Sequence, residues 1–285
     1  MSEAAAALGS RPRALVAELR KLPAFARRDF LVAWSYRMSF VSDWVGLAVQ
    51  VVLFGFISRL IDPGKLPVYG GTQATYLEFV VVGIAVGVFL QLGLHEVVTG
   101  IRQEQLMGTL ESLLTTPTAP ATIQIGSVVY QLIYIPIRTA IFLVVVSAVF
   151  GLNFHASGLL PSALILFVFV GFVWGIGVAS AAGILTYRRG AGALALGVGL
   201  LTLVSGAYFP LDVFPDWLAT IARANPVTVA IEGMREALIG GSGWDGIGGR
   251  MAILVPAAVV ALTVGVLAFR RALRREQRLG TIGLY

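Results

Sequence analysis

The stretch PSALILFVFVGFVWGIGVASAAGILT, residues 161–186, decides the class of fold, because none of its 26 residues is charged. A helix crosses the hydrocarbon core of a bilayer with about 20 consecutive apolar residues, so this stretch is long enough to span it. Five further apolar runs flank it along the chain. The six predicted spans cover about residues 40–61, 76–101, 122–151, 161–186, 191–209 and 251–269.

The composition of the whole chain agrees with a membrane fold. Of its 285 residues, 57% are apolar and 13% are charged, whereas about 25% of the residues of soluble domains are charged. So few charges could not cover the surface of a soluble fold, and the apolar content excludes disorder. We therefore predict an all-α polytopic membrane protein with one transmembrane domain over residues 1–285. The absence of cysteine excludes disulfides and thiolate sites.

The positions of Lys and Arg predict how the spans are oriented. With six spans both termini lie on one side, and that side holds 15 of the 21 basic residues, against four in the opposite loops. Cytoplasmic loops carry the excess of Lys and Arg, so we expect a multi-pass protein of the cytoplasmic (inner) membrane with both termini in the cytoplasm. The net charge of +6 follows from this flanking pattern, and nucleic acid is not expected as a partner.

Two regions outside the spans also show amphipathic patterns. Residues 12–38 interleave leucines and aromatic residues with arginines, which favours an interfacial helix on the inner membrane face. An orientation signal with some helicity is the alternative. Residues 210–249 hold apolar pieces too short to span, and we expect re-entrant or surface helices there, at the outer mouth.

The sequence offers no candidate catalytic residue and no metal site. The two histidines, His95 and His155, are far apart and have no second ligand at a recognised spacing. Ser205 could suggest an intramembrane serine protease, but neither histidine is placed to serve it. A P-loop needs Lys after Gly and before Ser or Thr, and the one lysine that follows a glycine, Lys65, precedes Leu66. We therefore expect no ATP hydrolysis by the chain itself.

Arg138 lies well inside the third predicted span. A cation at the bilayer centre costs about 2.5–3.5 kcal/mol on insertion scales, so its side chain should face protein or water and find an acid. Glu96 and Asp43, near the cytoplasmic ends of their spans, are the candidate partners in a buried ion pair. Direct contact with a substrate and snorkelling to the interface remain alternatives.

Two segments between spans carry the most specific patterns. In residues 102–116 the leucines recur at i, i+4, i+7 and i+8, which predicts an amphipathic helix able to dock on a cytoplasmic protein, ended by Pro117. Its candidate residues are Glu104, Leu106, Gly108, Thr109, Leu110, Glu111, Leu113, Leu114 and Pro117. The second segment begins in the outer half of the fifth span. Its candidate residues are Ser205, Gly206, Phe209, Pro210, Pro215, Trp217, Asn225, Pro226 and Arg235.

Both segments resemble those of the permease subunits of type-2 ABC exporters. In that family the loop after the second span carries an acid, then Gly-Thr-Leu-Glu, two leucines and Thr-Pro, here Glu104, 108–111, 113–114 and 116–117. The late segment of the family has Ser-Gly-x-x-Phe-Pro, Pro-x-Trp-Leu, Asn-Pro and an Arg, here within residues 205–235. The six spans, the cytoplasmic termini and the N-terminal interfacial helix match as well. Arg138 is not part of the family pattern.

The resemblance implies a mechanism and a set of partners. It implies two six-span halves, a homodimer or a heterodimer with a paralogue, and a path between them at the second and fifth spans. Residues 102–116 would be the coupling helix that sits in a groove of a separate cytoplasmic ATPase subunit, which would hold the ATP and magnesium. Membrane lipids are further partners. The substrates that the resemblance implies are amphipathic small molecules, lipids or lipid-linked glycans, and a weak match to the glycan exporters before the first span favours the first two.

Two other functions compete with this one. A secondary transporter driven by an ion gradient would need buried acids and broken helices near mid-membrane, and the spans lack that set. A membrane-bound enzyme or a non-catalytic scaffold is the other alternative, and no paired catalytic groups favour the enzyme.

Overall fold

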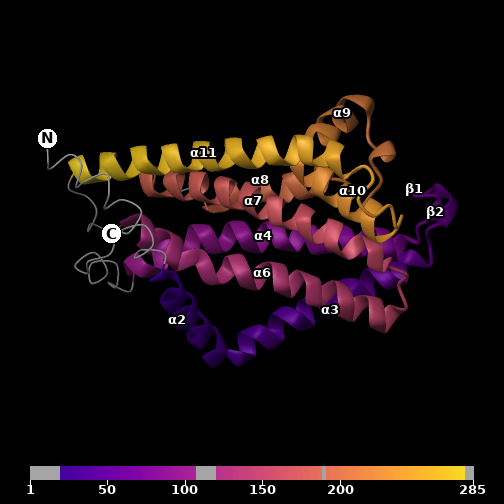
Figure 1. The fold of residues 1–285 in the computed structure, drawn as a ribbon, viewed down its shortest axis with the longest axis horizontal. Coiled ribbons are helices and arrows are strands. Elements are labelled where there is room, and N and C mark those ends of the chain that lie inside the picture. The colour runs from indigo at the N-terminus through magenta and orange to yellow at the C-terminus, as the bar shows by residue number, and fades with distance from the viewer. Residues whose placement is uncertain (1–19, 107–119, 188–190, 280–285) are drawn as a thin grey trace, which may run out of the picture.

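The computed structural model describes residues 20–106, 120–187 and 191–279. They form a bundle of long helices with a hairpin and two short helices at one end (Figure 1). The helices are α2 (Leu22–Ser35), α3 (Arg37–Ser58), α4 (Tyr76–Leu106), α6 (Pro120–Phe150), α7 (Leu159–Tyr187), α8 (Ala191–Val204), α9 (Asp216–Ala224), α10 (Pro226–Leu238) and α11 (Ile247–Leu279). Strands β1 (Val68–Tyr69) and β2 (Thr72–Gln73) pair antiparallel.

Within the described residues, four helices are long and apolar enough to cross a membrane. Their candidate spans are Tyr76–His95, Val129–Phe150, Ala156–Gly183 and Ile247–Ala272. They coincide with the second, third, fourth and sixth predicted spans. The first predicted span falls on α3, whose apolar part, Trp44–Ser58, is shorter. The fifth falls on α8, which has 14 residues and ends at Val204 rather than at the predicted residue 209.

The early end of α8 has a local cause. Gly206 adopts φ +73°, in the left-handed region that an α-helix does not use and that glycine tolerates. Ser205 precedes it, and its hydroxyl donates to the carbonyl of Thr202 at 2.6 Å instead of facing outward. The chain therefore turns here and runs toward α9 and α10.

The start of α4 is fixed by reciprocal capping. The hydroxyl and the backbone N–H of Thr75 both donate to Oε2 of Glu78 at 2.9 Å, and the N–H of Glu78 donates to Thr75 Oγ1 at 3.3 Å. This is the capping box of a helix N-terminus. The other carboxylate oxygen of Glu78 accepts from the N–H of Asn153 at 3.1 Å. The buried carboxylate thus ties the start of α4 to the turn between α6 and α7.

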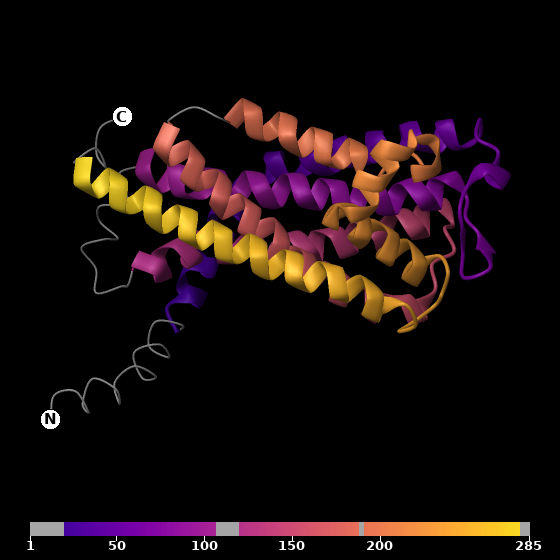
Figure 2. The same ribbon diagram turned by 90° about the horizontal axis from the view of Figure 1, so that it is seen from above.

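Helix α7 packs closely along α11 through the small residues Gly171 and Gly175, which lie four residues apart. A Cβ added at Gly175 would collide with the backbone of Ala261 and Leu262, and one added at Gly171 would touch the side chains of Ala258 and Leu262. Small residues let two helix backbones approach in this way. Figure 2 shows α11 and α8 bordering opposite sides of the bundle.

Helix α2 covers Leu22–Ser35 of the predicted N-terminal amphipathic segment, and residues 12–19 of that segment lie outside the described part of the chain. Helix α2 meets α3 at an angle (Figure 1), with Tyr36 at the junction. It also packs against α6, because the ring of Phe25 covers Gly126 and Phe30 lies edge-on to Tyr130, with ring centroids 6.4 Å apart.

Candidate functional site

The late segment singled out in the sequence gathers at the hairpin end of the bundle. Asn225 and Pro226 start α10. The side chain of Asn225 accepts from the N–H of Val227 at 3.0 Å, and Pro226 occupies the first turn, where its missing N–H costs no hydrogen bond. The amide of Asn225 also donates to the carbonyl of Leu201 at 3.4 Å. One residue therefore caps α10 and fastens it to the last turn of α8.

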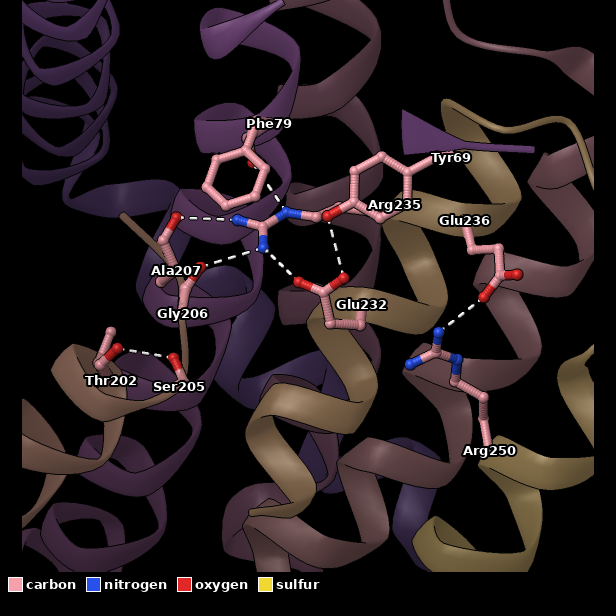
Figure 3. Close-up of polar contacts among 10 residues, drawn as sticks. All are labelled: Tyr69, Phe79, Thr202, Ser205, Gly206, Ala207, Glu232, Arg235, Glu236 and Arg250. Carbon is pink, nitrogen blue, oxygen red and sulfur yellow. Dashed lines mark hydrogen bonds and ion pairs between the residues drawn. The ribbon is translucent and has the colours of Figure 1, made fainter. Parts of the chain in front are cut away.

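Arg235, on α10, is the centre of a polar network and is 0% exposed. Its Nε donates to the carbonyl of Phe79 at 3.0 Å, and its Nη2 donates to the carbonyl of Ala207 at 3.0 Å. Its Nη1 donates to the carbonyl of Gly206 at 3.0 Å and to Glu232 Oε1 at 2.7 Å. Figure 3 shows the guanidinium between these groups. Buried charge is tolerated when it is paired and hydrogen-bonded in this way.

The ring of Phe79 adds a second kind of contact. The guanidinium carbon of Arg235 lies 3.4 Å from the ring centroid, so the cation faces the negative face of the ring. Phe79 belongs to the first turn of α4, and its ring and its carbonyl both engage the same side chain. Arg235 thus joins α10 to the start of α4 and to the turn after α8. We call Arg235, Glu232, Tyr69 and the carbonyls of Phe79, Gly206 and Ala207 the outer clamp.

The hairpin joins the outer clamp through Glu232. The hydroxyl of Tyr69, on β1, donates to Glu232 Oε2 at 2.9 Å, while the other oxygen accepts from Arg235. Burial raises the pKa of Tyr69 well above its usual range, the carboxylate of Glu232 raises it further, and the Arg235 cation opposes the shift. Tyr69 therefore stays a neutral donor to Glu232.

Close backbone contact holds the turn after α8 in place. Ala207 is 0% exposed, and a Cβ at Gly83 of α4 would collide with its carbonyl. The next residue, Tyr208, accepts through its carbonyl from the hydroxyl of Tyr76 at 3.1 Å, and its ring stacks on that of Phe54, with centroids 5.5 Å apart. Helices α3, α4 and α8 therefore meet at this turn.

The structure brings only part of the predicted late segment together. Ser205, Gly206 and Arg235 lie in or beside the outer clamp, whereas Asn225 and Pro226 lie at the other end of α10, where they cap the helix. Phe209 and Trp217 are 47% and 67% exposed, and Pro215 is exposed as the N-cap of α9, whereas Pro210 is half-buried. None of these four residues is among the hydrogen-bond partners described for Arg235, which are Phe79, Gly206, Ala207 and Glu232.

Sequence reasoning missed Tyr69, Phe79 and Glu232. Glu232 could have been found, because it lies three residues before Arg235 on one helix and such pairs face each other. The backbone carbonyls that accept from Arg235 cannot be recognised in the sequence, because every residue has a backbone carbonyl. The capping box of Thr75 and Glu78 is also visible in the sequence, as Thr-x-x-Glu.

Arg138 is 7% exposed, and its guanidinium carbon lies 5.9 Å from the ring centroid of Trp44 on α3. It is therefore buried between helices. The side chains of its predicted partners, Asp43 and Glu96, lie outside the described part of the structure, so the ion pair stays a prediction.

The predicted coupling segment is described only at its start. Helix α4 continues past the predicted span end at residue 101 and includes Glu104 and Leu106 in its final turn, of which the backbone alone is described. The other residues named for this segment, Gly108, Thr109, Leu110, Glu111, Leu113, Leu114 and Pro117, lie outside the described residues.

The chemistry of the outer clamp is that of a structural joint. Its arginine donates to three main-chain carbonyls and to the Glu232 carboxylate, whose other oxygen accepts from Tyr69, so these polar groups are engaged with one another. Across the described parts of the chain, no cluster of three His, Cys, Asp or Glu residues could hold a metal ion.

Comparison with known proteins gives consistent matches. Residues 20–239 match the family described as ABC-2 type transporter. The chain is 29% identical over 184 residues to linearmycin resistance permease protein LnrN of Bacillus subtilis (strain 168), across 64% of this chain and 47% of that protein. It is 24% identical over 180 residues to ABC transporter G family member 20 of Dictyostelium discoideum, across 62% of this chain and 24% of that protein. The chain therefore aligns with about half of one relative and a quarter of the other.

Proposed function

The chain belongs to the ABC-2 type transporter family, and from that membership we propose that it is the permease subunit of an ATP-driven exporter. In this proposal it moves an amphipathic small molecule, a lipid or a lipid-linked glycan outward. A separate cytoplasmic subunit binds ATP and magnesium and hydrolyses the nucleotide. A second copy or a paralogue completes the path between two halves.

The single observation that carries this proposal is the extent of the family match. It runs over residues 20–239 and so includes both segments on which the sequence resemblance rests, 102–117 and 205–235. The sequence contains no P-loop, which fits a subunit whose ATP is bound elsewhere. The name of the Bacillus subtilis relative, a resistance permease, supports outward transport of a small molecule.

The arrangement of charged residues supports the proposed orientation. Lys65, Arg223 and Arg250 belong to the end that carries the hairpin, α9 and α10, whereas α2 and the C-terminal end of α11 lie at the opposite end (Figure 1). The end that carries α2 and the C-terminal part of α11 holds most of the basic residues outside the apolar helices. This excess of positive charge favours the cytoplasmic side for that end of the bundle.

A cytoplasm-specific reporter should work after Tyr285 and fail between residues 210 and 249. Activity at the latter position would refute the six-span orientation.

Helix α4 suggests how the two ends communicate. It is one helix of 31 residues, or about 46 Å at 1.5 Å per residue. One end runs into the proposed coupling segment, and the other carries the Phe79 carbonyl that Arg235 binds. A rigid helix held at both ends can transmit a displacement produced by the ATPase to the outer clamp. In this proposal the clamp keeps the start of α4 and the last turn of α10 together as the halves move.

The experiment that tests the proposal is directed at the coupling segment. We expect Leu110→Asp or Leu114→Asp to abolish association with the ATPase while the permease still inserts, because both leucines lie on the apolar face predicted to enter one groove. Glu111→Gln should weaken coupling only mildly, since exposed ion pairs contribute about 0–1 kcal/mol. The measurement is pull-down of the ATPase together with transport in the same membranes. Normal association and transport in both aspartate variants would remove the coupling-helix assignment.

A further inference from the structure

The C-terminal end of α11 carries a one-sided set of arginines. The candidate span on this helix ends at Ala272, while the helix continues to Leu279. Figures 1 and 2 both show that it reaches farther than the neighbouring ends of α4 and α7. Arg270, Arg271, Arg274 and Arg275 are exposed here. At 100° per residue these four side chains occupy an arc of about 140° on the helix surface. We call these four residues the arginine arc.

The arginine arc points away from the rest of the bundle. Phe269 and Ala272, on the opposite side of the same turns, are each 6% exposed and pack with Ala182 of α7. Among the acidic side chains that the structure describes, none forms an ion pair with the arc. The packing of the helix therefore holds its four positive charges outward.

The same face of α11 is apolar below the arc. Ile253, Val260 and Leu267 are 46%, 60% and 45% exposed and lie seven residues apart, and Arg274 is the next residue at that spacing. Val264, 53% exposed, precedes Arg271 by the same interval. Residues seven apart lie nearly above one another on a helix. One outward stripe therefore changes from apolar side chains to arginines where the candidate span ends.

We propose that the arginine arc binds the headgroups of anionic phospholipids. An outward apolar stripe on a candidate span of 26 residues is suited to lipid hydrocarbon, and the layer that follows at the depth of the arc is that of the headgroups. Clusters of Lys and Arg next to a span bind anionic lipid, and guanidinium groups bind phosphate through paired hydrogen bonds. A second copy presenting the same arc would be repelled by it. The proposal does not depend on the transport function.

Native mass spectrometry of the purified full-length chain tests this. Phosphatidylglycerol and phosphatidylcholine are added at equal concentrations, and the ratio of the two single-lipid complexes is measured. The wild-type chain is expected to prefer phosphatidylglycerol. Substitution of Arg271, Arg274 and Arg275 by Gln should lower this preference at least about fivefold, the effect expected of a single arginine near an anionic surface. Arg274→Gln alone should show part of the loss and serves if the triple variant gives no folded protein.

Two further variants test whether the lipid preference depends on where the positive charge lies or only on the total charge of the protein. Arg59, Lys65 and Arg223 are exposed and belong to the other end of the bundle, so their triple change to Gln removes the same charge and should leave the preference unchanged. Replacing the three arc arginines by Lys keeps the charge and should keep most of the preference. An unaltered preference in the arc Gln variants overturns the proposal. The proposal is also overturned if a Gln variant keeps its lipid preference but loses a copurifying ATP-binding subunit, because the arc would then be a docking surface for that subunit.

Discussion

At the scale of single residues, Arg235 joins several parts of the structure, a role that no hydropathy pattern indicates. It bonds three carbonyls from two other parts of the chain and one carboxylate, all without exposure. The sequence could single it out as part of a motif, and Asn225 likewise as a helix cap. It could not identify the partners of Arg235, because main-chain carbonyls look the same in every residue.

Removing the side chain of Arg235 should destabilise the protein strongly. In Arg235→Ala three carbonyls and Glu232 lose their donor while they remain buried or half-buried, and breaking a buried ion pair costs about 3–5 kcal/mol. The measurement is the thermal unfolding midpoint of the purified protein, together with its folded yield. Arg223→Gln is the control, because that guanidinium is 64% exposed and 3.8 Å from its partner Asp212. An Arg235→Ala protein that unfolds at the wild-type midpoint would show that the clamp is dispensable.

Ionisation of Tyr69 should make the stability of the folded protein decrease with rising pH in the alkaline range. Its pKa is raised in the folded protein, whereas the pKa of an unfolded tyrosine is about 10. Above that pH the unfolded state loses its phenolic proton first, so stability present below pH 10 is lost as pH rises. Tyr69→Phe cannot ionise. We therefore expect the gap in unfolding midpoint between wild type and Tyr69→Phe to shrink or reverse from pH 8 to about pH 11. A gap that is constant over this range would contradict the assigned ionisation.

At the scale of elements, the sequence predicts best the helices that contain a long apolar run. The described spans on α4, α6, α7 and α11 coincide with predicted runs. The ends differ where local chemistry decides. Helix α8 stops at Val204 because Gly206 takes a left-handed conformation, and α4 extends to Leu106 because the polar residues after 101 are good helix formers. Neither effect alters the apolar pattern.

The packing of α7 on α11 gives a sharp test with an internal control. Gly175→Ala places a methyl group against the backbone of Ala261 and Leu262, and an overpacked contact costs about 1–3 kcal/mol. Gly183 lies on the same helix, and a Cβ there meets no described atom within 4 Å. Gly183→Ala should therefore be neutral or slightly stabilising, since alanine favours helix. Thermal unfolding of both variants checks this. Equal effects of the two substitutions would argue against the close approach at Gly175.

At the scale of the whole molecule, the outer clamp and the proposed coupling segment lie at opposite ends of α4. The position of the clamp could not be predicted, because it depends on the hairpin, α8 and α10 converging from distant parts of the sequence. The class of protein could be predicted, since it follows from apolar runs, charge asymmetry and two short motifs. The family match over residues 20–239 confirms that class.

The most direct test of the central claim is purification of the tagged chain from its native membranes, followed by an ATPase measurement. We expect a separate subunit with a P-loop to copurify and the complex to hydrolyse ATP, whereas the chain alone should not. Transport in those membranes should stop when ATP is depleted and continue when ion gradients are collapsed. If the chain purifies without any ATP-binding subunit, and transport follows the ion gradient instead, the chain is not the permease of an ATP-driven exporter.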